Sequence, residues 1–197
     1  FRRVLFRSPV LLLCYRAGPI VVSWYSSIKL KGVAMDWLAF DAESLYFDDA
    51  PSDAVCRLLN KAADHYGEET AEHDLNKAYA LEPQSLMVLV ALFRFYFYQQ
   101  RLSEALAISA QARAIVAEHL SLPARWEAVT EEQLRQGKEN QAAMARFYLL
   151  CLKGEGYLHI RLGERDQGMA LLNKVVEMDP QDHFGASALM AVVDNAA

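Results

Sequence analysis

Residues 86–117, LMVLVALFRFYFYQQRLSEALAISAQARAIVA, decide the fold, because they read as two helices joined by the polar turn Gln99, Gln100 and Arg101. Aromatic side chains surround the first helix, so it must pack on more than one face. They are Phe93, Phe95, Tyr96, Phe97 and Tyr98. The second helix is rich in alanine, which lets a neighbouring helix approach closely. A bulky helix followed by a slender one predicts a stacked helical repeat.

Two further helices are predicted immediately before this stretch. Ser52 or Asp53 can cap a helix that runs with apolar residues at helical spacing to Gly67, which ends it. Residues 68–81 form the next helix, and Pro83 stops it, because proline disfavours helical geometry in the residue before it. The last ten residues of this region, LNKAYALEPQ at 75–84, recur in register as LNKVVEMDPQ at 172–181. An internal repeat is therefore expected.

These residues resemble the tetratricopeptide repeat, whose helical pairs recur about every 34 residues. The first unit matches through Val55, Leu58, Leu59, Ala62, Ala71, Leu75 and Pro83, the second through Leu89, Leu92, Phe93, Tyr96 and Ala105, and the last through Leu152, Gly156, His159, Gly168, Leu172 and Pro180. In the second unit Ser109 replaces the expected large residue. The chain as a whole is also faintly similar to small repeat proteins encoded among bacterial nitrogen-fixation genes.

The resemblance implies an all-α fold, a right-handed superhelical stack of about three helical hairpins with an extra helix before the last unit. The second hairpin is expected to run on to His119 or Leu120, and the extra helix to occupy residues 123–135. Another helix begins at residues 137–140, and the helical pattern then continues to Leu162. A final capping helix is predicted at 184–193, with Leu189 and Val192 inward. Gly154 and Gly156 are expected to permit close helix contact.

The first 34 residues differ in composition from the rest. They hold six Lys or Arg and no acidic residue, whereas the whole chain holds 20 basic and 25 acidic residues. The chain from Met35 onward therefore carries 14 basic residues (20 − 6) and a net charge of −11 (14 − 25). An acidic balance of this kind argues against DNA or RNA as a partner.

Three interpretations of residues 1–34 remain open. Residues 1–8, FRRVLFRS, look like a translated sequencing adapter, and KGV at 31–33 can be a translated ribosome-binding site, which would make Met35 the natural start. Alternatively, the segment is a targeting peptide. A membrane anchor is the third reading, although Arg16, Gly18 and Pro19 divide the apolar stretch into short pieces. Residues 35–51 are predicted to be a capping arm and 52–197 the repeat domain.

Candidates for chemistry are sparse. His65, Glu69 and His73 would share one helix face, but Gly67 interrupts that face, so no metal site is predicted. The cysteines lack CxxC partners, and no glycine-rich phosphate loop follows a strand. We therefore expect no cofactor and no catalytic residue, in a protein of the cytoplasm.

The better candidate is a partner-binding groove. In the tetratricopeptide family the first helices of successive units line the concave face, which would place six residues of this chain there. They are Arg94, Phe97, Tyr98, Lys153, Tyr157 and Arg161. Basic and aromatic side chains together suit an acidic or C-terminal segment of another protein. The alternative is that the rings pack between helices and the arginines pair with local acids.

The expected function is thus a non-catalytic protein–protein interaction module, an adaptor or assembly helper. Two other classes stay open. One is a small enzyme or metal-handling accessory protein whose site is assembled by the fold, and the other is a homodimer closed by its exposed aromatic face.

Overall fold

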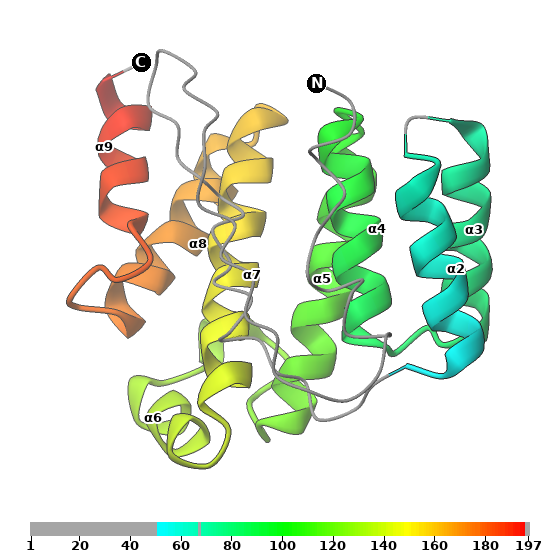
Figure 1. The fold of residues 1–197 in the computed structure, drawn as a ribbon. Coiled ribbons are helices and arrows are strands. Elements are labelled where there is room, and N and C mark those ends of the chain that lie inside the picture. Colours follow the sequence, from blue (N-terminus) through cyan, green and yellow to red (C-terminus); the bar gives the residue numbers. More distant parts are fainter. Residues whose placement is uncertain (1–50, 67, 196–197) are drawn as a thin grey trace. The chain divides into compact units, whose positions relative to one another are not determined.

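The computed structural model describes residues 51–66 and 68–195, with backbone alone at residues 138 and 140, and every regular element in this part is a helix (Figure 1). The helices are α2 (Asp53–Asp64), α3 (Glu69–Leu81), α4 (Leu86–Tyr98), α5 (Leu102–His119), the 3-10 turn η2 (Trp126–Ala128), α6 (Glu131–Asn140), α7 (Ala142–Arg161), α8 (Arg165–Met178) and α9 (Ala186–Asn195). The predicted all-α class is confirmed for these residues. The chain divides into two compact units, residues 1–88 and 89–197.

Helices α2 and α3 pack together in the first unit. The Ser52 side chain accepts a hydrogen bond from the Val55 amide, so the predicted cap of α2 is confirmed. Lys61 pairs across the hairpin with the buried carboxylate of Asp74 at 3.7 Å. The apolar seam of the hairpin is Val55, Leu59, Ala62, Ala71, Leu75 and Ala78, each at most 1% exposed.

The repeated segments end in the same backbone conformation. Glu82 closes α3 at φ −137° and ψ 76°, and Asp179 closes α8 at φ −131° and ψ 71°. Each donates its amide to the carbonyl four residues earlier, on Ala78 and Val175. The side chains of Ala78 and Val175 are fully buried, and those of Leu75 and Leu172 are at most 1% exposed. The predicted internal repeat is therefore present in structure as well as in sequence.

The turn between α4 and α5 falls at residues 99–101, as predicted. Gln100 has φ +60°, and the amides of Gln100 and Arg101 donate to the carbonyls of Phe97 and Tyr96. This is the Schellman arrangement, which satisfies the last carbonyls of a helix through a residue in left-handed geometry. Helix α5 continues to His119, as expected. Helix α7 closes in the same way at Gly163, with φ +87°.

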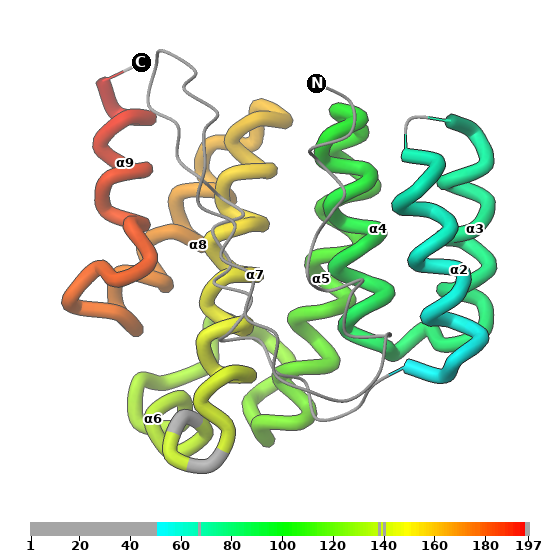
Figure 2. Tube along the Cα trace, viewed as in Figure 1, coloured from blue at the N-terminus to red at the C-terminus, as the bar shows by residue number. Residues whose placement is uncertain are grey.

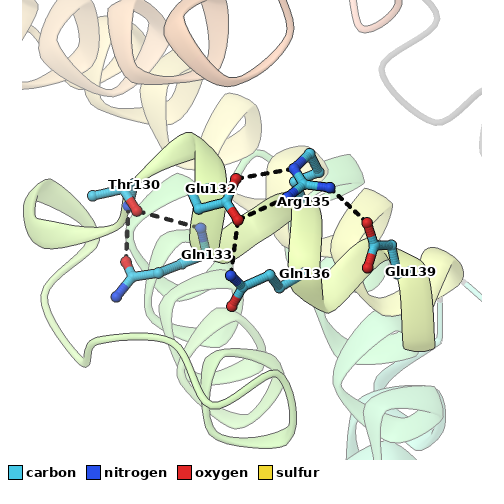
Figure 3. A network of polar contacts seen from close by, with 6 residues as sticks. All are labelled: Thr130, Glu132, Gln133, Arg135, Gln136 and Glu139. Atoms are coloured by element: carbon cyan, nitrogen blue, oxygen red, sulfur yellow. Dashed lines mark hydrogen bonds and ion pairs between the residues drawn. The ribbon is translucent and has the colours of Figure 1, made fainter.

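An extra helix is present before the last unit, but its predicted bounds of 123–135 are wrong. Figure 2 follows the chain from α5 through the short turn η2 into α6, which begins only at Glu131. Thr130 and Gln133 form a reciprocal capping box at that point, and Val129 before them is extended. Arg135 pairs with Glu132 and Glu139 on the outer side, while Gln136 donates to Glu132 (Figure 3). Helix α6 therefore runs through Gly137, where a new helix was expected to begin.

Helix α7 is the central element of the second unit, because α5, α6 and α8 all pack against it (Figure 1). Its crossing with α8 is very close. A Cβ atom at Gly168 would lie 2.5 Å from the Gly156 carbonyl oxygen, and one at Gly156 would lie 2.9 Å from Leu172. The predicted role of Gly156 in close helix contact is confirmed.

Helix α9 packs on α8 and begins two residues later than predicted. Leu189 is buried, as expected, at 2% exposure. Val192 is 44% exposed, so the prediction that it faces inward is wrong. Leu189 and Val192 lie three residues apart on this short last helix, and the second is much more exposed.

The interpretations of residues 1–34 and the predicted capping arm at 35–51 fall almost entirely outside the described residues, which begin at Pro51. Within the part of the chain that the structure describes, no helix combines the length and apolarity needed to cross a membrane.

Candidate protein-binding surface

The C-terminal ends of α4 and α7 meet through aromatic rings. The Phe97 and Tyr157 ring centroids are 6.4 Å apart at a tilt of 43°. Phe97 also stacks on Phe93 at 5.9 Å and meets Tyr98 edge-on at 5.8 Å. Ring pairs at these separations add to the stability of a contact beyond the area they bury. The rings of the two helices therefore form one connected surface.

Arg161 closes this surface from the last turn of α7. Its Nη1 donates to the Tyr157 hydroxyl at 2.8 Å, and its Nη2 donates to Gln100 Oε1 at 3.1 Å. The guanidinium carbon also lies 5.6 Å from the centre of the Tyr157 ring. Both hydrogen-bond acceptors are neutral, so the positive charge is oriented without being neutralised.

Gln100 is the link that sequence reasoning missed. Its Nε2 donates to the Phe97 carbonyl at 3.3 Å, which points its Oε1 toward Arg161. The left-handed backbone of Gln100 closes α4 at the same time. We call Phe97, Tyr98, Gln100, Tyr157 and Arg161 the aromatic–arginine cluster.

Part of the cluster is accessible to a partner. Tyr98 is 41% exposed, and Leu162, which follows Arg161 in the chain, is 37% exposed. Arg161 is exposed, whereas Phe97 and Tyr157 are half-buried. The two half-buried rings support the exposed groups, which is the arrangement of a rigid contact surface.

The other two predicted groove residues lie apart from the contacts described. Arg94 is one turn earlier on α4 and half-buried. Lys153 is one turn before Tyr157 on α7, but its ammonium group donates to the Phe184 carbonyl in the loop before α9. Burial lowers the pKa of Lys153. Four of the six predicted residues, Phe97, Tyr98, Tyr157 and Arg161, are thus brought together.

A second polar cluster lies at the contact of α5 and α7. Arg113 Nε donates to both carboxylate oxygens of Glu155, at 2.9 and 3.0 Å. The Glu155 side chain is 4% exposed and the Arg113 side chain 13%. Ser109, Tyr148 and Cys151 are buried near this pair. It forms a buried ion pair inside an otherwise apolar helix contact.

Burial dominates the electrostatics of this second cluster. It raises the pKa of Glu155, and the adjacent Arg113 charge offsets only part of that rise. Burial alone would lower the pKa of Arg113, but Glu155 reverses the effect and the net pKa is raised. Burial also raises the pKa of Tyr148 to about 12 and raises the pKa of the Cys151 thiol. A thiol whose pKa is raised is a poor nucleophile.

The histidines with described contacts each bond to one carboxylate. These pairs are His65 with Glu68, His159 with Glu164, and His183 with Asp179. Within residues 51–66 and 68–195, no three His, Cys, Asp or Glu side chains converge as metal ligands. His65 follows α2, whereas Glu69 and His73 belong to α3, so the predicted interruption of that face is observed.

Comparison with known proteins gives one informative relative. The chain is 43% identical over 159 residues to an uncharacterized 19.8 kDa protein from the nifW 5′ region of Azotobacter chroococcum mcd 1. The match covers 81% of this chain and 89% of that protein. The expected similarity to a protein from a nitrogen-fixation gene region is thereby confirmed. No protein-family model matches the chain, and no solved structure does.

Proposed function

The chain belongs to the family of the uncharacterized 19.8 kDa protein from the nifW 5′ region, and from this premise we propose that it is a non-catalytic adaptor or assembly helper. In this proposal the aromatic–arginine cluster of α4 and α7 holds a segment or surface of another protein. The observation that carries it is the orientation of Arg161 by Tyr157 and Gln100 beside partly exposed rings. Tyr and Arg are enriched among the residues that dominate protein interfaces.

The proposed architecture is a tetratricopeptide-like stack with a concave, right-handed surface. The α2–α3 hairpin and the matching ends of α3 and α8 support it, because repeat units bury equivalent positions in equivalent ways. Such stacks present their first helices to a partner. In this chain that role falls to α4 and α7, which carry the cluster.

The proposed setting is the cytoplasm of a nitrogen-fixing bacterium. The support is the relative, which is encoded in the nifW 5′ region. On this proposal the partner is a protein made during nitrogen-fixing growth. Extracts of Azotobacter chroococcum grown with and without ammonium are therefore the matched sources for a search.

Affinity capture with the full chain tests the proposed function. The Arg161→Glu variant reverses the charge of the cluster, and Arg125→Glu makes the same change at a side chain 82% exposed outside it. Wild type and Arg125→Glu are expected to capture the same protein from nitrogen-fixing cells, and Arg161→Glu is expected to lose it. Circular dichroism of all three proteins checks that helicity is unchanged.

Capture that survives Arg161→Glu would refute the cluster as the contact surface. Loss of capture in both variants would show that overall charge, and not the cluster, governs binding. A species of twice the monomer mass in place of a foreign protein would favour the homodimer.

A further inference from the structure

We infer that the cluster recognises an acidic segment of its partner, with a side-chain carboxylate on Arg161 and a neighbouring apolar side chain against Tyr98. This inference rests on the proposed function and specifies the chemistry of the partner. Three observations carry it, namely the charges of α4 and α7, the bonding of Arg161, and the exposed apolar groups beside it.

Positive charge is concentrated on the two helices that carry the cluster. Helix α4 has Arg94 and no acidic residue, and α7 has Arg146, Lys153 and Arg161 against the single acid Glu155. Together they carry +3 (4 − 1), in a chain whose residues from Met35 onward sum to −11. Arg146 and Arg161 are the exposed charges among these, whereas Arg94 and Lys153 are half-buried. Glu155 is buried and paired with Arg113. This charge pattern is complementary to an acidic segment.

The spread of the positive charge favours a segment over a single chain end. Arg146 and Arg161 are both exposed and stand near opposite ends of α7. Fifteen residues of helix separate them by roughly 22 Å at 1.5 Å per residue. One terminal carboxylate cannot reach both, whereas about seven residues of extended chain span that distance. We therefore commit to side-chain carboxylates along an internal segment.

The bonding of Arg161 leaves it suited to a carboxylate. A guanidinium has five N–H donors in a planar fork, and Tyr157 and Gln100 each accept a hydrogen bond from Arg161. Among residues 51–66 and 68–195, no carboxylate forms an ion pair with Arg161. A guanidinium group that is already held in place loses less conformational freedom when a carboxylate binds to it.

The ends of the two helices do not oppose an anion strongly. A helix C-terminus has a partial negative charge from its unpaired carbonyls. Here the Schellman bonds of Gln100 and Arg101 satisfy carbonyls at the end of α4, and those of Gly163 and Glu164 do so at the end of α7. Arg161 itself sits in the last turn of α7, where its charge compensates what remains.

The apolar part of the inference comes from Tyr98 and Leu162. These two large side chains are 41% and 37% exposed at the ends of α4 and α7. An acidic segment without apolar residues would leave them in water. A segment that alternates acidic with apolar side chains covers them and meets Arg161 at once.

A second copy of this chain is a poor occupant of the same surface. Two copies in a symmetric dimer would bring the positive faces of α4 and α7 together, inside molecules that each carry a net charge of −5. Both contacts are between like charges and oppose association.

Fluorescence anisotropy with synthetic peptides tests the inference directly. The probe is a labelled peptide that alternates Asp or Glu with Phe or Leu and ends in an amide. Its control has the same sequence with Asn and Gln in place of the acids. We expect the full chain to bind the acidic peptide at least about tenfold more tightly than the amide control, since charge-assisted bonds exceed neutral ones.

Three variants separate charge from geometry. Arg161→Gln is expected to weaken binding of the acidic peptide about tenfold, and Arg125→Gln to leave it unchanged. Arg161→Lys keeps the charge but lacks the fork, so it should recover only part of the affinity. Gln100→Gly suits the left-handed backbone and removes the group that positions Arg161, so it should weaken binding with helicity intact.

Equal binding of the acidic and amide peptides, or no binding of either, would overturn the inference. An Arg161→Gln variant that binds like wild type would also overturn it. These failures are distinct from failure of the proposed function, because protein capture can still depend on the cluster when the acidic peptide does not bind. A cluster variant that captures the natural partner normally would instead overturn the proposed function.

Discussion

Arg113 and Glu155 show how two residues can fix one helix contact. Both lie in the interface between α5 and α7, where their two hydrogen bonds replace the water that each charge has lost. Such a pair adds little net stability compared with apolar residues of similar size, but removing one member leaves a buried charge. We therefore expect the pair to select the register of α5 against α7 more than it strengthens the contact.

Arg113→Met should destabilise the protein by about 3–5 kcal/mol, because it leaves the Glu155 carboxylate buried without its partner. Urea denaturation followed by circular dichroism measures the loss. The double variant Arg113→Met with Glu155→Leu should recover most of it. A double variant as unstable as the single one would show that the pair is needed for more than charge balance.

The loss of stability caused by Arg113→Met should also depend on pH. Burial already raises the pKa of Glu155 in the presence of Arg113, and removing that charge raises it further. A carboxyl whose pKa is higher in the folded state contributes most stability when it is protonated in both states. That contribution is lost as pH rises above the ordinary carboxyl value through the folded one. The free energy of unfolding of the variant relative to wild type should thus be closer to zero at pH 5 than at pH 8. A difference that does not vary with pH would contradict this assignment.

At this scale the sequence predicts some residues of the site and misses others. Phe97, Tyr98, Tyr157 and Arg161 were predictable, because they stand on first helices of repeat-like units. Gln100 was not, since its role depends on a side-chain bond to α7, 61 residues away. Ser109 did leave a signal, because it stands where the repeat expects a large residue. The pairing of Glu155 with Arg113 could not be predicted from the sequence, because it depends on how α5 packs against α7.

Helices α7 and α8 can approach closely because Gly156 and Gly168 have no side chains at their crossing. The two backbones approach so closely that a Cβ at Gly168 meets a backbone oxygen and Ile160 at 2.5 Å. Backbone atoms cannot move aside as the end of a flexible side chain can. The crossing therefore depends on two glycines that lie within helices, where glycine is otherwise unfavourable.

Gly168→Ala should destabilise the protein by about 1–3 kcal/mol, despite the better helix propensity of alanine, because the added methyl overlaps the α7 backbone. Gly137→Ala in α6 is the matched control. There the new Cβ lies 3.2 Å from a flexible Leu120 methyl group, so the gain in propensity offsets the contact. Thermal unfolding of both variants checks this. Equal melting temperatures would contradict the account of the crossing.

Elements with clear boundaries in the sequence were predicted well. The start of α2 follows its cap, the end of α3 precedes Pro83, and the turn between α4 and α5 falls at three polar residues. The prediction for residues 121–140 is wrong in its helix bounds, because no helix starts at Pro123. The actual start is the capping box of Thr130 and Gln133, a short signal that the longer apolar pattern obscured.

The whole molecule combines an acidic composition with a positive surface on α4 and α7. We propose that this separation of charge favours a foreign partner over a second copy. The predicted all-helical class followed from helical periodicity, the primary secondary-structure signal in a sequence, together with the resemblance to helical repeats. The right-handed superhelix and the tetratricopeptide assignment stay predictions, because several different helical repeats share these patterns.

We expect the isolated protein to remain monomeric as its concentration rises. Like charges oppose the approach of two copies through the cluster, and salt reduces that repulsion only beyond about 8 Å at physiological ionic strength. Sedimentation velocity over a hundredfold range of concentration measures the mass. A sedimentation coefficient that rises toward that of a dimer, and does so less in Tyr98→Ala, would favour self-association instead.

Site-specific photo-crosslinking tests the central claim that the cluster contacts another protein. A photoreactive phenylalanine analogue at Tyr98 reports on the cluster, and the same analogue at Val192 reports on a side chain of similar exposure in α9. In nitrogen-fixing cells, the account predicts one crosslinked foreign protein from position 98 and none from position 192. No product at 98, the same product from both positions, or a product of twice the monomer mass would contradict it.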